Sequence, residues 1–363
     1  MSRYIISRAL SDKVLMIGVY YKHHAPGGMA AVIQYYSQYI EHLNYVCSWR
    51  LTHFMGRVWY AGYALVNVIA RLLFDRKIKI LHIHVAADAS YHRKMIFVKL
   101  GKLMKKKVIL HVHSSRFKDF YDEQSEDRKK KIEKELTIPD KLLVLSESWK
   151  EWFQGINIPS EHIEVLHNIT EQPVEMPVAP DGKTHLLFLG ELGQRKGVFD
   201  LLKAISNNKD EFRNKIVLRI GGNKNEEKLK SFISDNNLLD FVFFEGWVAG
   251  DKKRHLLNWA DIYVLPSFNE GLPIGILEAM SYRCVIVSTP VGGIPEIVIP
   301  NKNGLLVEPG NVAEIAEAIR KLIGLENLED YKKASECMVQ AYLPIPVMEH
   351  LKNIYNQLLL TSE

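Results

Sequence analysis

Short apolar runs of strand length alternate with helical segments along most of the chain, and this alternation sets the fold class. The run at residues 13–20, KVLMIGVY, is apolar after its first residue, as expected of a strand buried on both faces of a parallel sheet. Similar runs recur at 78–85, 107–112 and 141–145, with helical stretches between them. Strands separated by helices predict βαβ units with parallel pairing, so the first part of the chain is predicted to be a doubly wound α/β domain.

A proline-rich segment at residues 171–183, EQPVEMPVAPDGK, interrupts this alternation and is typical of a linker. Strand-length runs restart at 185–189 and continue as far as 284–288. A chain of 363 residues is also longer than one compact core of ordinary size. We therefore predict two Rossmann-like domains, at 1–172 and 184–340, which leave a cleft for ligands at the carboxyl ends of their sheets.

Composition is that of an ordinary globular protein, with 47% hydrophobic and 25% charged residues. We expect no transmembrane helix, because no run of about 18 uncharged apolar residues occurs. The segment before Lys13 does not resemble a secretory signal, since it lacks a long apolar stretch. The three cysteines, Cys47, Cys284 and Cys337, are far apart and lack metal-ligand spacing, as expected of thiols in a reducing compartment. These features favour a cytoplasmic location.

Charge is distributed unevenly along the chain. Residues 1–150 contain 26 Lys and Arg against 13 Asp and Glu, a net of +13, which leaves 47 − 26 = 21 basic and 42 − 13 = 29 acidic residues, a net of −8, for the remainder. A basic first half favours an anionic partner, either nucleic acid or a membrane surface. The predicted helix within 91–107, YHRKMIFVKLGKLMKKK, either presents a basic face to an anionic membrane or is a packing helix with a solvated face. No nucleic-acid-binding module is recognisable, so we expect no nucleic acid partner.

Two carboxylates, Glu270 and Glu278, flank a Gly-Leu-Pro turn in the segment 265–296, LPSFNEGLPIGILEAMSYRCVIVSTPVGGIPE. A strand is predicted before the turn, and a helix over 274–281 after it. Helical side chains lean back toward the helix N-terminus, so both carboxylates can face one crevice and accept hydrogen bonds from hydroxyl groups. The alternative is an ordinary α/β loop, with Glu270 solvated and Glu278 on the helix surface.

The N-terminus of that predicted helix is suited to an anion. Pro273 fits the first helical position, where its missing N–H costs nothing. The N–H groups of Gly271, Leu272 and Ile274 can meet phosphate oxygens, with help from the helix dipole. Carboxylates beside a phosphate site indicate a ligand with both phosphate and sugar hydroxyls, namely a nucleotide sugar.

Glu270 and Glu278, with GLP and LEAM between them, resemble the E-x7-E motif of retaining glycosyltransferases of the GT4 type, which have the GT-B fold. The resemblance implies that Glu270 contacts the hydroxyls of the donor sugar and that Glu278 contacts the ribose. It also implies two Rossmann-like domains that face each other across a cleft. A C-terminal helix in 341–363 would then cross back to the first domain.

The segment FLGELGQRKGVFD at 188–200 resembles the family's G-R-x-x-x-K-G segment, in which Arg and Lys hold the phosphates of the donor. Lys196 matches the family lysine. The chain departs from the pattern at Glu191, where the family most often has Arg, and Arg195 can supply that charge from a neighbouring position. The alternative is a solvated basic turn.

Histidines alternate near the ends of two predicted strands. His113, which precedes Ser114, resembles the family's strand-end histidine, which approaches the donor sugar. For its strand neighbour His111, and for His82 in the similar alternation of His82 and His84, we expect packing and hydrogen bonding. Alternating histidines can also hold a metal ion, but no third ligand of suitable spacing is visible in the sequence. The family needs no metal, so we expect neither a metal nor another cofactor.

Glycines mark further loops of the predicted site. Gly27 and Gly28 match the family's N-terminal glycine pair, where a bare backbone admits the donor phosphates or the acceptor. Gly246 follows a predicted strand of the second domain and fits a loop that receives the nucleotide.

The sequence thus predicts a retaining glycosyltransferase that moves a sugar from a nucleotide sugar, with a UDP-sugar favoured, to a saccharide or lipid-linked saccharide. The basic first domain fits an acceptor at the inner face of a membrane, in cell-surface polysaccharide synthesis. A nucleotide-sugar 2-epimerase is an alternative, although such enzymes lack the E-x7-E pattern. A non-catalytic GT-B scaffold is another, supported by Glu191. The oligomeric state is open.

Overall fold

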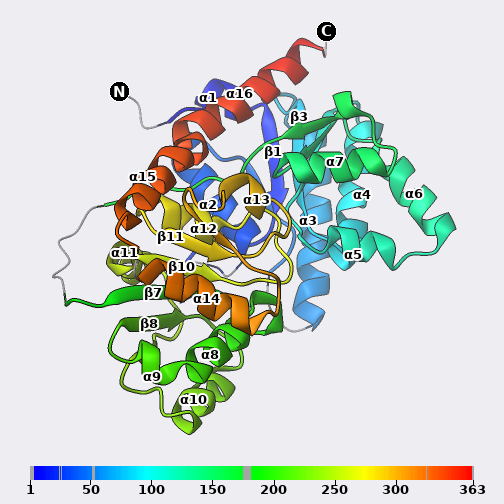
Figure 1. Ribbon diagram of the computed structural model, residues 1–363. Helices are drawn as coiled ribbons and strands as arrows, with labels where there is room; N and C mark the ends of the chain where they lie inside the picture. The colour runs from blue at the N-terminus through cyan, green and yellow to red at the C-terminus, as the bar shows by residue number, and fades with distance from the viewer. Residues whose placement is uncertain are drawn as a thin grey trace. The chain divides into compact units, whose positions relative to one another are not determined.

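The structure is a computed structural model that describes residues 4–23, 25, 27–50, 54–174, 181–323 and 325–361. Part of the predicted linker, residues 175–180, lies outside the described residues. The chain divides into two compact units: Met1–Ile169 with Pro344–Glu363 form unit 1, and Thr170–Leu343 form unit 2. Figure 1 shows the elements of both units.

The described part of unit 1 contains a six-stranded sheet in the order β2-β1-β3-β4-β5-β6. Every neighbouring pair in it is parallel. The strands are β1 Val14–Gly18, β2 Tyr45–Cys47, β3 Ile80–Val85, β4 Lys107–Val112, β5 Lys141–Val144 and β6 Ile163–Val165. Their helices are α1 Arg8–Ser11, α2 Gly28–Tyr39, α3 Phe54–Phe74, α4 Ala89–Leu103, α5 Phe117–Asp122, α6 Glu126–Leu136, α7 Glu147–Gly155, the 3-10 turn η1 Ser160–His162 and α16 Pro344–Leu360.

The two faces of this sheet carry different side chains, because residues alternate along each strand. Leu81, Ile83 and Val85 of β3 join an apolar core with residues of α3 and α4. The intervening His82 and His84 point to the other face, where tyrosines of α2 and α16 contact them. His82 and His84 therefore lie between the sheet and the helices α2 and α16.

The described part of unit 2 contains a second six-stranded sheet, in the order β12-β11-β10-β7-β8-β9, and it is also parallel throughout. Its strands are β7 Thr184–Leu189, β8 Ile216–Gly221, β9 Val242–Phe244, β10 Ile262–Leu265, β11 Val285–Ser288 and β12 Gly304–Leu306. Its helices are α8 Val198–Asn207, α9 Lys209–Phe212, α10 Glu226–Asp235, α11 Gly250–Trp259, α12 Ile274–Ser281, α13 Ile294–Ile297, α14 Val312–Ile323 and α15 Leu328–Met338, with the 3-10 turns η2 Gln194–Lys196 and η3 Val339–Tyr342.

The predicted fold class, α/β with two doubly wound parallel sheets, is confirmed. Predicted strand ends differ from the observed ones by a few residues. Residues 78 and 79, for example, precede β3, because the Ile78 N–H closes a turn onto the carbonyl of Asp75. Such offsets are expected, since local turn bonds at strand ends do not change the apolar pattern.

Candidate functional site

A buried ion pair lies where β7 and β10 end. The two strands are parallel neighbours, so their carboxyl ends share one edge of the sheet. Lys196, which follows β7, places its Nζ 2.5 Å from Oε1 of Glu270, which follows β10. The Ser267 hydroxyl donates to the same oxygen at 2.8 Å. Side chains of Lys196 and Glu270 are only 16% and 7% exposed, so water screens the pair weakly.

Backbone contacts fix the segment that carries Lys196 against residues 266–273, which we call the glutamate loop. The Phe268 N–H donates to the Arg195 carbonyl at 2.8 Å, and the Arg195 guanidinium donates to the Asn269 carbonyl at 3.3 Å. Gly197 has a left-handed φ of +69°, and a Cβ there would lie 2.0 Å from the Pro266 carbonyl oxygen. Only glycine lets the two segments approach this closely.

A second glycine holds the glutamate loop from its other side. Gly292 has a φ of +56°, and a Cβ there would lie 1.9 Å from the carbonyl oxygen of Glu270. The next residue, Gly293, donates its N–H to the Gly271 carbonyl at 2.7 Å. The predicted site residues Glu270 and Gly271 are therefore held by the backbone of the turn that follows β11.

Helix α12 spans Ile274–Ser281, as predicted from the sequence. The prediction of Pro273 in the first helical position is wrong, because its ψ of 116° is extended and makes it the N-cap of the helix. Its carbonyl accepts the N–H groups of Ile276 and Leu277. The first-turn N–H groups of a helix have no intrahelical acceptor, so an anion can still be bound at this end. Leu272, 2% exposed, anchors the turn in the core.

Glu278, the second predicted carboxylate, forms another ion pair. Its Oε1 lies 2.6 Å from Nζ of Lys253 on α11, and its side chain is 10% exposed. Sequence reasoning missed Lys253, since it lies among other basic residues of GDKKRH and no spacing links it to the glutamate. The alternative interpretation, in which Glu278 lies on the helix surface, is wrong, because its carboxylate is buried and paired with Lys253.

Tyr263 of β10 shows that the two glutamates surround one region. Burial first, and then the charges of Glu278 and Glu270, raise the pKa of the Tyr263 phenol well above its usual range. The phenol donates to the Leu189 carbonyl at 3.0 Å, at the end of β7. The structure therefore brings together both glutamates and the end of β7, where Lys196 follows. Figure 1 shows β7, β10 and α12 as neighbouring elements of unit 2.

Two further residues of unit 2 border this edge of the sheet. Glu191, which stands in place of the family's arginine, pairs with Lys224 at 3.0 Å. That pairing neutralises its charge near Arg195. Gly246, after β9, accepts a hydrogen bond from the N–H of Gly222 at 2.8 Å and so lies beside the loop after β8.

The remaining predicted site residues belong to unit 1. His113 follows β4, and its Nε2 lies 2.8 Å from Nδ1 of His84. His82 contacts the Tyr355 hydroxyl of α16 through Nδ1 at 2.7 Å and Nδ1 of His111 through Nε2 at 3.2 Å. Burial lowers the pKa of His82 and His113 to about 3, and those of His84 and His111 lie well below the usual range for the same reason. At neutral pH these imidazoles are uncharged and act as hydrogen-bond partners.

The sequence prediction that no third ligand joins the alternating histidines is wrong. Ligand atoms of His82, His84 and His111 all lie within 4.8 Å of one another, because β3 and β4 pair side by side. The rings of His82 and His84 are stacked, with centroids 4.5 Å apart and planes 16° apart. His82 contacts His111 and His84 contacts His113 through ring nitrogens, so the four histidines form a hydrogen-bonded stack.

The glycine pair lies at the N-terminus of α2. Gly27 is the N-cap of that helix, with a φ of 109°, and Gly28 is its first residue. Among the described residues, a Cβ at either position would meet no atom within 4 Å, so open space surrounds this turn. The predicted site residues thus form two groups, with Gly27, Gly28 and His113 in unit 1 and the others in unit 2.

Family models match most of the chain. Residues 30–171 match the model described as Glycosyltransferase Family 4, and residues 172–337 match the model described as Glycosyl transferases group 1. The boundary between the two matches is close to the boundary between the two units.

Similar proteins bear glycosyltransferase names. The chain is 27% identical to WcaL of Escherichia coli (strain K12), named as a colanic acid biosynthesis glycosyltransferase, over 52% of this chain and 49% of WcaL. It is also 27% identical to the amylovoran biosynthesis glycosyltransferase AmsK of Erwinia amylovora, over 54% of this chain and 51% of AmsK. The matches thus span about half the length of these relatives.

A solved structure shares the fold of the whole chain. Sucrose-phosphate synthase from Thermosynechococcus elongatus superposes with a TM-score of 0.79 at 17% identity, over 96% of this chain and 99% of that one. Within the described residues, no helix combines the length and the apolar character needed to cross a membrane.

Proposed function

We propose that this chain, which belongs to the GT4-type glycosyltransferases, transfers a sugar from a nucleotide-sugar donor to a saccharide acceptor. The observation that carries the proposal is the buried pairing of Lys196 with Glu270, at 2.5 Å, beside the N-terminus of α12. Buried charges are costly, and a protein that only needed a stable loop would be served as well by apolar residues. A cation, a carboxylate and a helix N-terminus in one place match a phosphate next to sugar hydroxyls.

Donor binding would exchange the partners within this site. Lys196 would turn from Glu270 to a phosphate oxygen, and Glu270 would accept hydrogen bonds from the sugar hydroxyls instead. Arg195, half-buried beside the glutamate loop, would add a second cation for the diphosphate. As the sugar leaves, negative charge develops on the diphosphate, and fixed cations stabilise that charge most.

Glu278 would bind the ribose hydroxyls of the nucleotide. Its Oε1 lies 2.6 Å from Nζ of Lys253, which holds the carboxylate in place. Two carboxylates that surround Tyr263 can thus read two sugars of one ligand, the ribose and the transferred sugar. UDP is the favoured nucleotide, because a solved relative in fold, HepE of Anabaena, was crystallised with UDP and glucose.

His113 would contact the donor sugar, as the resemblance to the family implies. Because burial holds its pKa near 3, its imidazole is neutral at pH 7 and offers a hydrogen bond rather than a charge. The contact with His84 at 2.8 Å fixes the ring, so the remaining nitrogen has a defined direction. The reaction would retain the anomeric configuration and would need no metal ion, as the resemblance to the family implies.

The acceptor would be a saccharide or a lipid-linked saccharide used in surface polysaccharide synthesis, with the enzyme working at the cytoplasmic face of a membrane. Two features support this extension. WcaL and AmsK carry names that refer to exopolysaccharides. The net charge of +13 over residues 1–150 favours an anionic surface.

A thermal-shift screen of UDP-, GDP- and ADP-sugars tests the donor site. A ligand that binds only the folded state raises the unfolding midpoint by mass action. We expect one nucleotide class to raise the midpoint of the wild type and to leave Lys196→Ala unshifted. Lys203→Ala is the matched control, because Lys203 is an exposed lysine of α8 paired with Asp200.

Turnover is then measured with the donor that binds, as release of the nucleoside diphosphate in the presence of saccharide acceptors. Glu270→Gln should bind donor weakly and release no product. If no donor raises the unfolding midpoint of the wild type, or if a donor raises the midpoints of wild type and Lys196→Ala equally, the result would argue for a non-catalytic scaffold and against the proposal.

A further inference from the structure

Helix α3 has apolar residues on every side, yet the part of the chain that the structure describes buries one of its faces and leaves the opposite face exposed. Ala64, Val68 and Leu72 are buried and belong to the core of unit 1. The opposite face is exposed and carries large apolar side chains. Their exposed fractions are Met55 68%, Val58 53%, Trp59 66%, Tyr63 51%, Val66 67%, Leu73 58% and Phe74 85%.

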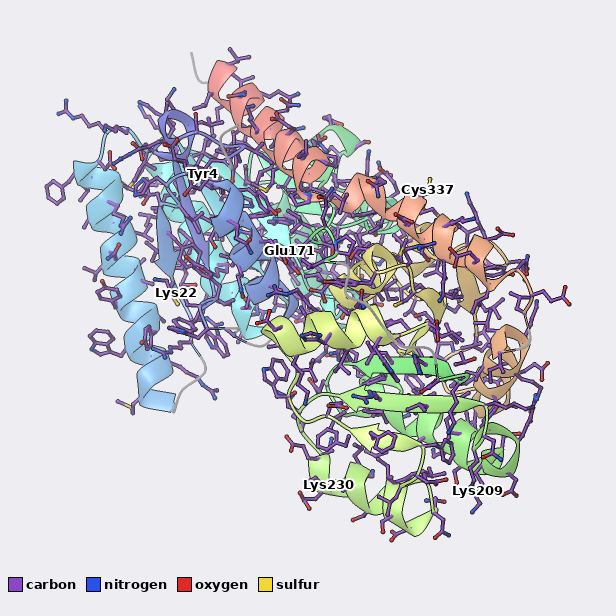
Figure 2. All side chains as sticks on the ribbon, turned by 90° about the vertical axis from the view of Figure 1, so that its left-hand side faces the viewer. Tyr4, Lys22, Glu171, Lys209, Lys230 and Cys337 are labelled. Carbon is purple, nitrogen blue, oxygen red and sulfur yellow. The ribbon has the colours of Figure 1, made fainter. Side chains whose placement is uncertain are left out.

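Spacing places these side chains in one stripe. Met55, Trp59, Tyr63, Val66 and Leu73 recur at intervals of three, four or seven residues, which keeps them on one side of a helix. The stripe follows a helix of 21 residues, about 30 Å long. Figure 2 shows this helix in light blue at the margin of unit 1, with ring-bearing side chains projecting away from the unit. Contiguous exposed apolar surface of this extent marks an interaction site.

The aromatic residues of the stripe are those favoured at a membrane interface. Trp59 and Tyr63 are stacked, with centroids 5.4 Å apart and planes 5° apart, and both rings are more than half exposed. The Tyr63 hydroxyl accepts a hydrogen bond from Asn67 at 3.2 Å. Tryptophan and tyrosine combine an apolar ring with a polar group, so they concentrate at the level of lipid headgroups.

Charge decides between a bilayer and a second copy of the chain. Helix α3 contains two basic residues, Arg57 and Arg71, and no acidic residue, and the Asp75, Arg76 and Lys77 that follow it leave the segment with a net positive charge. A symmetric contact between two copies would oppose positive charge to positive charge. An anionic bilayer complements the same charges, and it also takes up the apolar stripe.

Helix α4, the basic helix considered from the sequence, offers less free charge than its composition predicts. Lys94 is buried, 2% exposed, and donates to the Ser48 hydroxyl. Lys99 pairs with Glu135, and Lys102 pairs with Asp140, each at 2.7 Å. Pairing with acidic neighbours removes much of the attraction that α4 would have for lipid headgroups.

We infer that the exposed stripe of α3 docks unit 1 onto an anionic membrane surface, with the helix lying in the plane of the headgroups. The inference deepens the proposed function, since it rests on an enzyme whose acceptor is lipid-linked. Docking through α3 would hold unit 1 against the surface where such an acceptor is anchored.

Vesicle sedimentation with the full chain tests the surface. The vesicles are phosphatidylcholine with phosphatidylglycerol, and phosphatidylcholine alone. Wild-type protein should partition onto the anionic vesicles at low salt. The double variant Trp59→Ser/Val66→Ser should lose at least about tenfold in partitioning, because two large side chains no longer enter the interface. Leu239→Ser in unit 2, at a leucine 64% exposed, is the control and should bind as the wild type does.

Three outcomes would overturn the inference. Absence of binding to anionic vesicles would exclude the membrane as partner. Equal binding of the double variant would place the contact elsewhere. A dimer in solution that the double variant abolishes would assign the stripe to a second copy. Thermal unfolding of each variant checks that it is folded. The donor-induced shift of the unfolding midpoint, measured on the same samples, distinguishes the two proposals. Vesicle binding without any donor-induced shift would contradict the proposed function and would still support the membrane-docking surface.

Discussion

The pair formed by Lys196 and Glu270 allows a prediction with a worked magnitude. At 2.5 Å and an effective dielectric constant of about 20, the attraction between the two charges is about 7 kcal/mol. Desolvation of two side chains that are 16% and 7% exposed offsets most of that attraction. The intact pair therefore contributes little net stability, whereas a single unpaired member is costly.

A double-mutant cycle separates these quantities. Lys196→Met leaves Glu270 buried with the Ser267 hydroxyl as its remaining partner, so the free energy of unfolding should fall by about 3–5 kcal/mol. Glu270→Gln keeps a hydrogen-bonding amide beside the lysine and should cost less, about 1–3 kcal/mol. The double variant buries no charge and should recover to within about 1–2 kcal/mol of the wild type. All three variants should lose donor binding.

Urea unfolding gives the free energies, read from the transition that the nucleotide sugar shifts in the wild type. A stable double variant without donor binding would establish that the pair serves the ligand rather than the fold. The reasoning fails if Lys196→Met is within about 1 kcal/mol of the wild type, because the carboxylate would then have found water or another cation.

Three further predictions concern other parts of the molecule. Gly292→Ala should lower the unfolding midpoint and weaken donor binding, because its Cβ would lie 1.9 Å from a carbonyl oxygen of the glutamate loop. Gly62→Ala is the control and should be neutral, because a Cβ there meets no described atom within 4 Å. Equal unfolding midpoints of the two variants would refute the close approach at Gly292. Lys253→Met should raise the donor KM more than it lowers kcat, as steady-state kinetics can check, because it removes the lysine that holds the carboxylate assigned to the ribose. Acid should destabilise unit 1, because the pKa of His82 and His113 is about 3 in the folded state and about 6.5 in the unfolded state. Their contribution to the free energy of unfolding is therefore fully present above pH 6.5. It falls by about 1.4 kcal/mol per pH unit for each histidine as the pH drops toward 3. Urea unfolding between about pH 7 and pH 5 that shows no such slope would contradict the burial of these imidazoles.

Sequence reasoning reached the fold, both members of the Lys196–Glu270 pair, and Glu278 of the second pair. Apolar runs identify parallel strands because both faces of such strands are buried. Glu270 and Lys196 could be named because each lies in a short motif next to a strand end. Their contact could not be predicted, since it depends on β7 and β10 being neighbours although 74 residues separate the two side chains. Strand order is set by tertiary packing and leaves no trace in the local pattern.

Other features had no local signature at all. Lys253 reaches Glu278 from a helix whose sequence looks like any solvated basic helix. The third histidine of the unit 1 stack comes from an adjacent strand, so alternation along one strand reveals only two members. No helix was predicted for the residues of α3, and only the structure shows which of its apolar residues join the core and which are exposed.

The two units handle buried polar groups in opposite ways, and the difference follows from what each would bind. Unit 1 keeps its histidines neutral, because four adjacent imidazoles could not all be charged away from water. Unit 2 keeps charges, but it buries them as pairs that sum to zero. A diphosphate would bring negative charge into unit 2. A site whose lysines and carboxylates sum to zero would repel that charge less than a site with carboxylates alone, and its lysines could still bind the phosphates. Paired cations can turn to the phosphate only if the carboxylates find donors in turn, and sugar hydroxyls supply those donors. A ligand with phosphates alone would draw Lys196 away from Glu270 and supply no hydroxyl donor in exchange, so the site should bind inorganic pyrophosphate far more weakly than a nucleotide sugar.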